Sequence, residues 1–258
     1  MSNNILLECQ NLKKYFETPY GSLHAVDDIS FQLEEGKTLG VVGESGCGKS
    51  TLLSLISGLL VPESGQILLH GQDVRDFHTG IGYMLQKDHL FEWRTIWQNV
   101  LLGLEIQKRI SRKTMEHTEE MLKDYGLLGF KQARPSQLSG GMRQRAALIR
   151  TLALDPDLLL LDEPFSALDY QTRLSVCDDI AGIIRKEKKT ALLVTHDLAE
   201  AISMADRVIV LSARPAKIRR IVPITLDLPE RTPMKTRNAP EFKDYFNLIW
   251  KELNTAHA

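Results

Sequence analysis

The feature that most constrains this chain is the stretch Gly43-Glu44-Ser45-Gly46-Cys47-Gly48-Lys49-Ser50-Thr51. It matches the phosphate-loop pattern of a glycine, four residues, a second glycine, a lysine and a serine or threonine. The glycines allow the backbone to turn so that its N–H groups and the start of the next helix face one anion. Lys49 adds positive charge for the β- and γ-phosphates, and Ser50 offers a hydroxyl to Mg²⁺, which prefers oxygen ligands. The stretch therefore predicts a site for a nucleotide triphosphate and magnesium.

The residues on either side of this loop support the prediction. The apolar residues 38–42 predict a short buried strand, and residues 51–56 predict an apolar helix that ends near Gly58. An accidental glycine-rich turn is the alternative, and the order of strand, loop and helix disfavours it.

Composition and charge describe an ordinary globular protein with a sizeable core: 258 residues, 43% hydrophobic and 25% charged. A net charge of -1 without a dominant basic patch predicts no nucleic-acid partner. The three widely spaced cysteines predict reduced thiols and no metal-ligand set. The start lacks a charged segment followed by an apolar run, and serines and a glycine break the apolar residues 52–61. We therefore expect neither a signal peptide nor a membrane span.

Two strands upstream of the loop predict an antiparallel layer, residues 5–12 and 25–33, with a turn near residues 18–21. Tyr15 and Phe16 lie between them, where an aromatic ring has room to stack on a base. A packing role at a strand edge is an equally good interpretation, and the sequence does not choose between the two.

Gln86 lies at the end of a further predicted strand. Residues 65–72 and 81–86 indicate two strands, and the second ends on this amide. In an open α/β sheet, ligands lie beyond the carboxyl ends of the strands, so the amide would reach the metal or the attacking water. A polar strand end without a function is the alternative.

Residues 88–155 show helical periodicity, which predicts a helical subdomain inserted in the α/β core. Trp93 and Trp97 lie near its start, four residues apart. They serve either as core packing or as a surface that faces a partner.

A second helix start directed at a phosphate is predicted within the same segment. Ser139 is a candidate N-cap for a helix that begins with Gly140 and Gly141. Two glycines behind a cap leave the N–H groups of the first turn open to an anion. An ordinary capped helix would give the same pattern.

Polar residues directly follow the carboxyl ends of two apolar strands. Residues 158–161 lead into Asp162 and Glu163, as expected of a central parallel strand. We assign Asp162 to the magnesium shell and Glu163 to polarising a water in line with the γ-phosphate. His196 follows the apolar residues 191–195 in the same way, which makes it a better candidate than His24, His70, His78, His89 or His117.

Together these motifs resemble the nucleotide-binding subunit of an ABC transporter over essentially the whole chain. Gln86 matches the Q-loop, residues 138–145 the signature, residues 158–163 the second nucleotide motif, residues 166–169 the D-loop, and His196 the switch histidine. The resemblance implies an ATPase that needs ATP and Mg²⁺ and forms an ATP-driven homodimer. Each ATP would lie between the phosphate loop of one chain and the signature helix of the other.

The resemblance also assigns the site residues. Those expected to contact the nucleotide are Phe16, Gly43, Glu44, Ser45, Gly46, Cys47, Gly48, Lys49, Ser50, Thr51, Ser139, Gly140, Gly141 and Asp169. The expected metal ligands are Ser50, Gln86 and Asp162, and the expected catalytic residues are Glu163, His196 and Gln86.

The expected fold is α/β, a P-loop NTPase core with a mainly parallel sheet, an N-terminal antiparallel β layer and an inserted helical subdomain. Residues 1–87 and 156–222 would form the nucleotide-binding core with the β layer, residues 88–155 the helical subdomain, and residues 223–258 a C-terminal extension. The extension carries an amphipathic helix expected to pack on the body through Phe242, Tyr245, Phe246, Ile249, Trp250 and Leu253.

Residues 82–88, the following Trp93-Arg94-Thr95, and Met142 in the signature are similar to import ATPases for nitrate, alkanesulfonates and taurine. Glu92 departs from the proline of many relatives, which bears on the fit to the membrane partner. The resemblance implies two membrane-spanning permease subunits, an extracytoplasmic solute-binding protein and a peripheral position at the cytoplasmic face of the membrane.

Two alternatives have different functions. A soluble ABC-type ATPase acting on ribosomes or DNA would usually carry two motif sets or long charged coiled coils, and this chain has neither. A nucleotide-sensing regulator without catalysis is disfavoured by the intact Lys49, Asp162, Glu163 and His196.

Cys47 is an unusual member of the loop. It lies next to Lys49 and close to a helix N-terminus, and both influences favour the thiolate. We therefore expect it to line the nucleotide pocket and to be the most reactive of the three thiols. A thiol shielded by the loop itself is the alternative.

Overall fold

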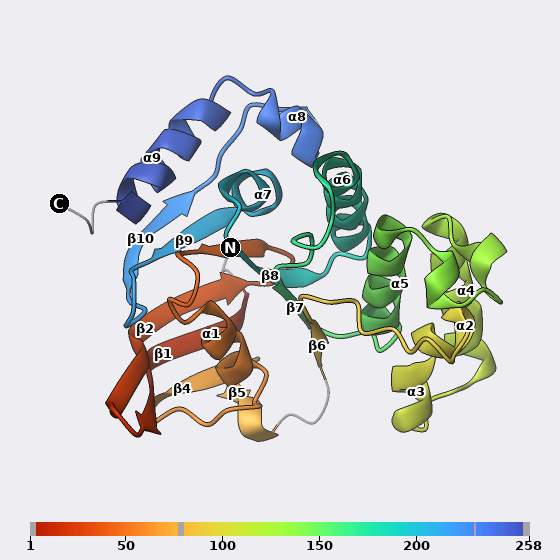
Figure 1. Ribbon diagram of the computed structural model, residues 1–258, viewed down its shortest axis with the longest axis horizontal. Coiled ribbons are helices and arrows are strands. Elements are labelled where there is room, and N and C mark those ends of the chain that lie inside the picture. The colour runs from red at the N-terminus through yellow and green to blue at the C-terminus, as the bar shows by residue number, and fades with distance from the viewer. Residues whose placement is uncertain (1–3, 77–79, 230, 255–258) are drawn as a thin grey trace.

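The computed structural model describes residues 4–76, 80–229 and 231–254, and within these ranges the strands form two sheets (Figure 1). A four-stranded antiparallel sheet has the order β2-β1-β4-β5, with β1 Ile5–Thr18, β2 Gly21–Glu34, β4 Ser64–Leu69 and β5 Gln72–Asp73. A six-stranded sheet has the order β10-β9-β3-β8-β7-β6, with β3 Thr38–Val42, β6 Ile81–Met84, β7 Leu158–Asp162, β8 Thr190–Thr195, β9 Arg207–Leu211 and β10 Ile218–Pro223. In the second sheet only β10 runs antiparallel to its neighbour. The expected α/β fold is confirmed.

The first two strands are longer than the sequence pattern predicted. Each has 14 residues, and together they form a hairpin that continues well past the predicted ends. Register shifts near Cys9, Leu12 and Lys14 interrupt the alternation of buried and exposed side chains. A bulge of this kind breaks the period of two on which strand prediction depends, so the outer half of the hairpin was missed.

The central strands form the core because both of their faces are covered. Every residue of β7 and β8 is buried, as expected of parallel strands between two layers. Leu158 and Leu160 pack on one face with helix α1, Lys49–Ile56, and with the antiparallel sheet. Leu159 and Leu161 pack on the opposite face in a second cluster, which holds the helices that follow β6. The phosphate loop thus lies between β3 and α1, on one face of the sheet.

The helices that follow β6 are α2 Ile96–Val100, α3 Leu102–Ile106, α4 Arg112–Asp124 and α5 Gly140–Leu152. Side-chain caps define three of their starts: Thr95 and Ser111 form capping boxes, and Ser139 accepts a hydrogen bond from the backbone N–H of Met142. The apolar face of α5 packs beside β6 in the cluster that includes Leu161. This confirms the predicted helical periodicity and the N-cap.

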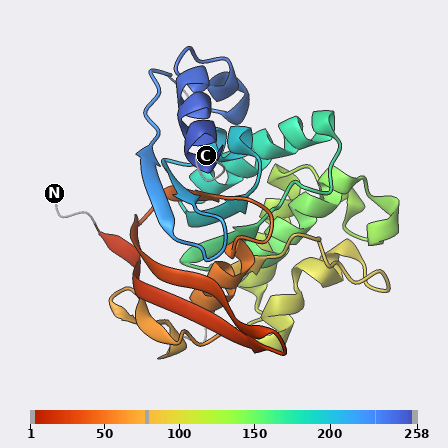
Figure 2. The same ribbon diagram turned by 60° about the vertical axis from the view of Figure 1, so that its left-hand side comes forward.

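The remaining helices are α6 Tyr170–Lys186, α7 Leu198–Met204, α8 Pro233–Arg237 and α9 Phe242–Asn254, and α9 lies at the end of the molecule opposite the β1–β2 hairpin (Figure 2). The amphipathic helix predicted near the C-terminus is α9. Its Ile249 is fully buried against α7 and β9, whereas Trp250 stays 56% exposed. Among the helices that the structure describes, none is both long enough and apolar enough to cross a membrane.

Candidate active site

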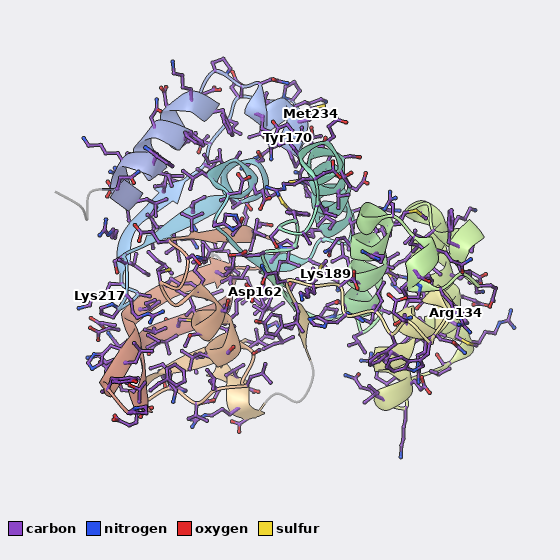
Figure 3. The ribbon with its side chains drawn as sticks, viewed as in Figure 1. Arg134, Asp162, Tyr170, Lys189, Lys217 and Met234 are labelled. Carbon is purple, nitrogen blue, oxygen red and sulfur yellow. The ribbon has the colours of Figure 1, made fainter. Side chains whose placement is uncertain are left out.

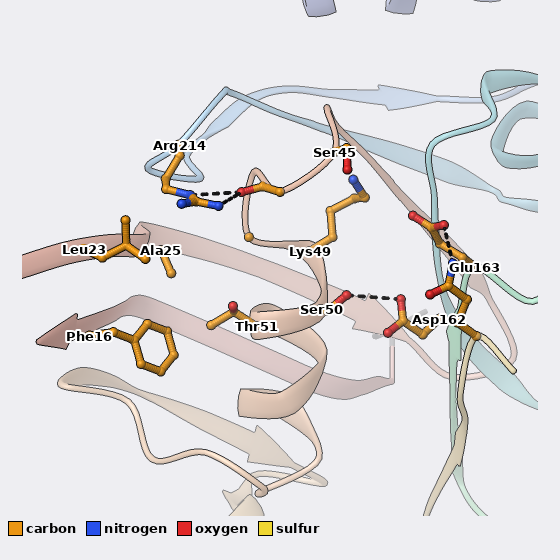
Figure 4. A pocket seen from close by; sticks show the side chains of 13 residues that line it. Phe16, Leu23, Ala25, Ser45, Lys49, Ser50, Thr51, Asp162, Glu163 and Arg214 are labelled. Carbon is orange, nitrogen blue, oxygen red and sulfur yellow. Dashed lines mark hydrogen bonds between the residues drawn. The ribbon is translucent and has the colours of Figure 1, made fainter. Parts of the chain in front are cut away.

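A cavity of about 350 Å³ lies beside the start of α1, near the centre of the molecule, where Figure 3 labels Asp162 (Figures 3 and 4). Its walls come from the phosphate loop, the carboxyl ends of β6 and β7, the β1–β2 hairpin and the β9–β10 connection. This is the edge at which an open α/β sheet binds ligands. The lining residues are Phe16, Leu23, Ala25, Ser45, Gly46, Gly48, Lys49, Ser50, Thr51, Gln86, Asp162, Glu163 and Arg214.

The phosphate loop is shaped by two glycines with positive φ, Gly46 at 74° and Gly48 at 125°. A Cβ on Gly48 would lie 2.4 Å from the carbonyl oxygen of Ala25, so only glycine fits there. Gly48 is also the N-cap of α1, and no side chain caps this helix start. Its first-turn N–H groups are therefore suited to an anion in the cavity.

Lys49 is the first residue of α1, and its side chain folds back over the loop. Its Nζ donates hydrogen bonds of 2.8 Å to the carbonyl oxygens of Gly43 and Glu44. The side chain is only 5% exposed, yet it lines the cavity. A buried ammonium needs such partners, and an entering phosphate would offer better ones.

Asp162 ends β7 as a buried carboxylate on the cavity wall. Its Oδ1 lies 3.5 Å from the Ser50 hydroxyl, and its Oδ2 accepts a hydrogen bond of 3.4 Å from the Tyr83 hydroxyl. Burial raises the pKa of Asp162, and the neighbouring Glu163 raises it further, while Ser50, Tyr83 and Lys49 oppose the rise. Burial also raises the pKa of Tyr83 to about 12, which keeps this phenol a hydrogen-bond donor. Tyr83 was not predicted as a site residue.

The donor set on this wall fits Mg²⁺. Ser50 and Asp162 present oxygen atoms 3.5 Å apart, and the amide of Gln86 lines the same cavity. In the described part of the chain, no group of three or more histidine, cysteine, aspartate or glutamate side chains forms a metal cage. Mg²⁺ is usually held by one or two protein ligands together with water and phosphate oxygens, so such a cage is not needed.

Glu163 lies one residue beyond β7 and is held between two other predicted site residues. Its Oε2 lies 3.2 Å from His196 Nδ1 and accepts a hydrogen bond of 3.3 Å from Gln86 Nε2. Gln86 also donates to the hydroxyl of Ser166 at 3.2 Å. The backbone of Glu163 has a φ of 45°, an uncommon conformation that the hydrogen bond from its N–H to Val194 O holds in place.

The aromatic pair at the end of β1 is separated by strand alternation. Phe16 lines the cavity, with Lys14 Nζ 5.5 Å from its ring centre. Tyr15 lies outside it, stacked on His24 at 3.8 Å and donating a hydrogen bond to Asp27 at 3.0 Å. Of the two rings that the sequence left open, only Phe16 lies where it would meet a base.

Several predicted contact residues are not brought to the cavity. Ser139, Gly140 and Gly141 start α5, whose apolar face packs on the other side of the sheet from α1. Asp169 caps α6 by accepting a 3.1 Å hydrogen bond from the N–H of Thr172. Gly43, Glu44 and Cys47 belong to the loop but do not line the cavity either.

The expectation that Cys47 lines the nucleotide pocket is wrong. Its thiol is 2% exposed, and its Sγ lies 2.7 Å from where a Cβ on Gly43 would be, so it points behind the loop into the core. Burial raises the pKa of Cys47, and this effect outweighs the influences of Lys49 and of the backbone N–H groups. Burial raises the pKa of Cys9 and Cys177 as well. The charges near the thiol can be read from the sequence, but the direction of its side chain cannot.

The two tryptophans have different environments. Trp97 is partly buried against the core cluster of the helices, with Lys131 Nζ 4.0 Å from its ring centre. Trp93 is 71% exposed and stacks on Phe91 at 4.7 Å. Core packing therefore describes Trp97, whereas Trp93 remains available to a partner.

Arg214 is the cavity residue that sequence reasoning missed most clearly. It lies in the β9–β10 connection, and its guanidinium donates to the carbonyl oxygen of Gly46 (Figure 4). Leu23 and Ala25 of β2 were also missed. None of the three lies in a motif, and only the pairing of distant segments brings them to the cavity.

Comparisons with known proteins agree with this geometry. Residues 26–166 match the family model described as ABC transporter. The chain is 47% identical to the uncharacterized ABC transporter ATP-binding protein YtlC of Bacillus subtilis, over 90% of this chain and 89% of that protein. It is 43% identical to the taurine import ATP-binding protein TauB of Pelagibacter ubique, over 82% and 80%, respectively. It is also 41% identical to the nitrate import ATP-binding protein NrtD of Synechocystis, over 94% and 93%.

A solved structure has a similar fold. It is a dimeric ATP-binding cassette in a post-hydrolysis state, bound to ADP and phosphate. The two chains are 27% identical, with a TM-score of 0.73 over 85% of this chain and 99% of the other.

Proposed function

Since this chain belongs to the ATP-binding proteins of ABC transporters, we propose that it hydrolyses ATP to energise the import of a small solute of the nitrate, alkanesulfonate or taurine kind through separate membrane subunits. The observation that carries the proposal is a single cavity that gathers the phosphate loop, Asp162, Glu163 and Gln86. ATPase activity is a property of the family, and the taurine and nitrate import proteins support the solute class.

ATP binding would use both ends of the cavity. Its phosphates would lie on the loop N–H groups and on Lys49, whose ammonium has a third N–H besides the two that donate to the carbonyl oxygens of Gly43 and Glu44. Its base would lie against Phe16, because this ring lines the wall formed by the β1–β2 hairpin.

Bound Mg²⁺ would neutralise the charge that develops on the phosphate oxygens. Ser50, Asp162 and Gln86 would hold it, as their shared position on the cavity wall suggests. Asp162 must be ionised for this role, and a cation beside it would oppose the rise in its pKa that burial causes.

Glu163 would accept a proton from the attacking water. The contacts at 3.2 Å and 3.3 Å from His196 and Gln86 orient its carboxylate, and its position beyond β7 places it on the cavity wall. His196 is 54% exposed beside it, where it would contact the γ-phosphate or hold the water.

The assembly would be an ATP-driven homodimer, in which Ser139, Gly140, Gly141 and Asp169 of one chain complete the nucleotide site of the other. This accounts for predicted nucleotide contacts that lie away from the cavity of their own chain. We place the dimer on the cytoplasmic face of the membrane, with two permease subunits and an extracytoplasmic solute-binding protein. Residues 88–155 would act as a helical subdomain, residues 1–87 and 156–222 as the nucleotide-binding core, and residues 223–258 as an extension.

An uptake experiment tests the proposal. Cells that lack this protein should lose uptake of nitrate, taurine or an alkanesulfonate, and the wild-type chain should restore it. Lys49→Ala should fail to restore uptake, whereas Lys37→Ala, which changes an exposed lysine outside the cavity, should succeed. Unchanged uptake of all three solutes in the deletion strain, with normal ATPase activity of the purified protein, would point to another solute or to a partner other than a transporter.

A further inference from the structure

The β9–β10 connection places an arginine against the phosphate loop. Arg214 Nε and Nη2 donate hydrogen bonds of 3.0 Å and 2.5 Å to the same acceptor, the carbonyl oxygen of Gly46. Figure 4 shows the guanidinium on the side of the loop opposite Asp162 and Glu163. Arg214 therefore contacts the loop from the side opposite these two carboxylates.

The backbone of this connection is fixed to the sheet that carries Phe16. Ala216 donates to Ala25 O at 3.1 Å, and its own carbonyl accepts from the N–H of Asp27 at 3.0 Å. Lys217 Nζ lies 2.9 Å from the carboxylate of Asp27. Arg214 thus projects from a segment that is anchored to β2.

The backbone carbonyls of the loop must be kept away from a bound phosphate, and Arg214 binds one of them. A phosphate loop binds anions through its N–H groups, and a carbonyl turned toward a phosphate would repel it. Lys49 binds the carbonyls of Gly43 and Glu44, and Arg214 binds that of Gly46. The Lys49 ammonium has a third N–H that it can donate to a phosphate, whereas both of the donors that Arg214 directs at the loop hold the Gly46 carbonyl.

We propose that Arg214 is a positioning residue of the nucleotide site, which holds the Gly46 carbonyl so that the N–H groups of the loop stay directed at the phosphates. This inference rests on the proposed nucleotide site. Gly46 depends on such a partner because its φ of 74° belongs to a conformation that a glycine leaves easily. The planar fork of arginine places two donors on one oxygen, and a lysine supplies a single point charge instead.

Steady-state kinetics of two variants test the proposal. Arg214→Ala should raise the KM for MgATP about threefold to tenfold, because an exposed charge-assisted hydrogen bond is lost, while kcat stays within about twofold of wild type. Arg214→Lys should recover only part of the loss. The dissociation constant of ADP, measured by calorimetry, should rise in parallel, since ADP also occupies the loop. The control is Arg220→Ala, which removes an exposed arginine that pairs with Glu252 at 2.8 Å, away from the cavity.

The outcomes separate the inference from the proposed function. An unchanged KM in Arg214→Ala, or a fall in kcat alone, would refute the role of Arg214. Full recovery by Arg214→Lys would show that charge rather than the fork geometry matters, and would also overturn it. A wild-type protein that neither binds nor hydrolyses MgATP would instead refute the proposed function.

Discussion

Replacement of Glu163 by glutamine tests the chemistry with the smallest change in shape. Glutamine keeps the size of the side chain and keeps an oxygen that can accept from Gln86, now 3.3 Å away. It removes the negative charge that faces His196 at 3.2 Å and the basicity that would take a proton from water. ATP should still bind, because neither the loop nor Lys49 depends on this carboxylate.

The expected loss of turnover follows from the role of Glu163 as a general base. Loss of a general base lowers turnover by about 10²- to 10⁴-fold. At about 1.36 kcal/mol for each factor of ten, the barrier would rise by about 2.7 to 5.4 kcal/mol. The fold should hardly change, because Glu163 raises the pKa of Asp162 and its removal relieves this repulsion inside a partly buried pair. A loss of activity through unfolding would appear as a lowered Tm, and we expect none.

The assay is phosphate release by the purified protein at saturating MgATP, with ATP affinity measured in parallel. Glu8→Gln is the matched control, since Glu8 accepts a hydrogen bond from Gln32 on the exposed face of the antiparallel sheet. It should leave turnover unchanged. If Glu163→Gln hydrolysed ATP at a rate near that of wild type, Glu163 would not be the base.

Three further predictions address assembly, the thiol and pH. Light scattering should find Glu163→Gln mostly monomeric without nucleotide and dimeric with ATP, and an equal dimer in both conditions would contradict nucleotide-driven closure. Maleimide should label Cys47 at least about tenfold more slowly in the folded protein than in urea, because the thiol is buried and its pKa is raised. Fast labelling of the folded protein that MgATP blocks would instead show that Cys47 lines the nucleotide pocket. Burial raises the pKa of Glu200 from 4.5 to about 7 in the folded protein. As the pH rises, this carboxyl therefore ionises first in the unfolded chain, which stabilises the unfolded state. The free energy of unfolding should fall between about pH 4.5 and 7, by an amount on the order of 3 kcal/mol. Glu200→Gln should lose that fall in urea unfolding, and an unchanged pH dependence would exclude Glu200 as its source.

The sequence was most informative where burial is complete. The interiors of strands β3, β7 and β8 are apolar and buried, so polar side chains mark where these strands end. The positions of Glu163 and His196 beyond the ends of β7 and β8 were predicted correctly for this reason, and the two side chains lie 3.2 Å apart. The phosphate loop was equally clear, because its glycines are needed for backbone conformations that few other residues adopt.

Residues brought in by the pairing of distant segments left no local signal. Arg214 reaches Gly46 across 168 positions, through a connection held by its bridge to β2. Tyr83 reaches Asp162 because β6 and β7 are neighbours in the sheet. The direction of a side chain inside a loop is also invisible to a motif, and Cys47 is the example.

Close packing of α5 on α6 is a second physical reason for a glycine at the start of α5. It decides how a role of this helix start in nucleotide binding can be tested. A Cβ on Gly141 would lie 2.7 Å from Cγ2 of Val176, so this glycine lets α5 approach α6 closely. Gly141→Ala would therefore disturb packing whether or not a nucleotide binds there. Ser139→Ala is the better variant, because Ser139 is exposed and its loss costs only the cap, about 1 kcal/mol. Ser111→Ala removes the equivalent cap of α4 and serves as its control. In the light-scattering experiment, made in the Glu163→Gln background, only the change at Ser139 should abolish the dimer that ATP induces, because only that helix start is expected to meet the phosphates of a second chain.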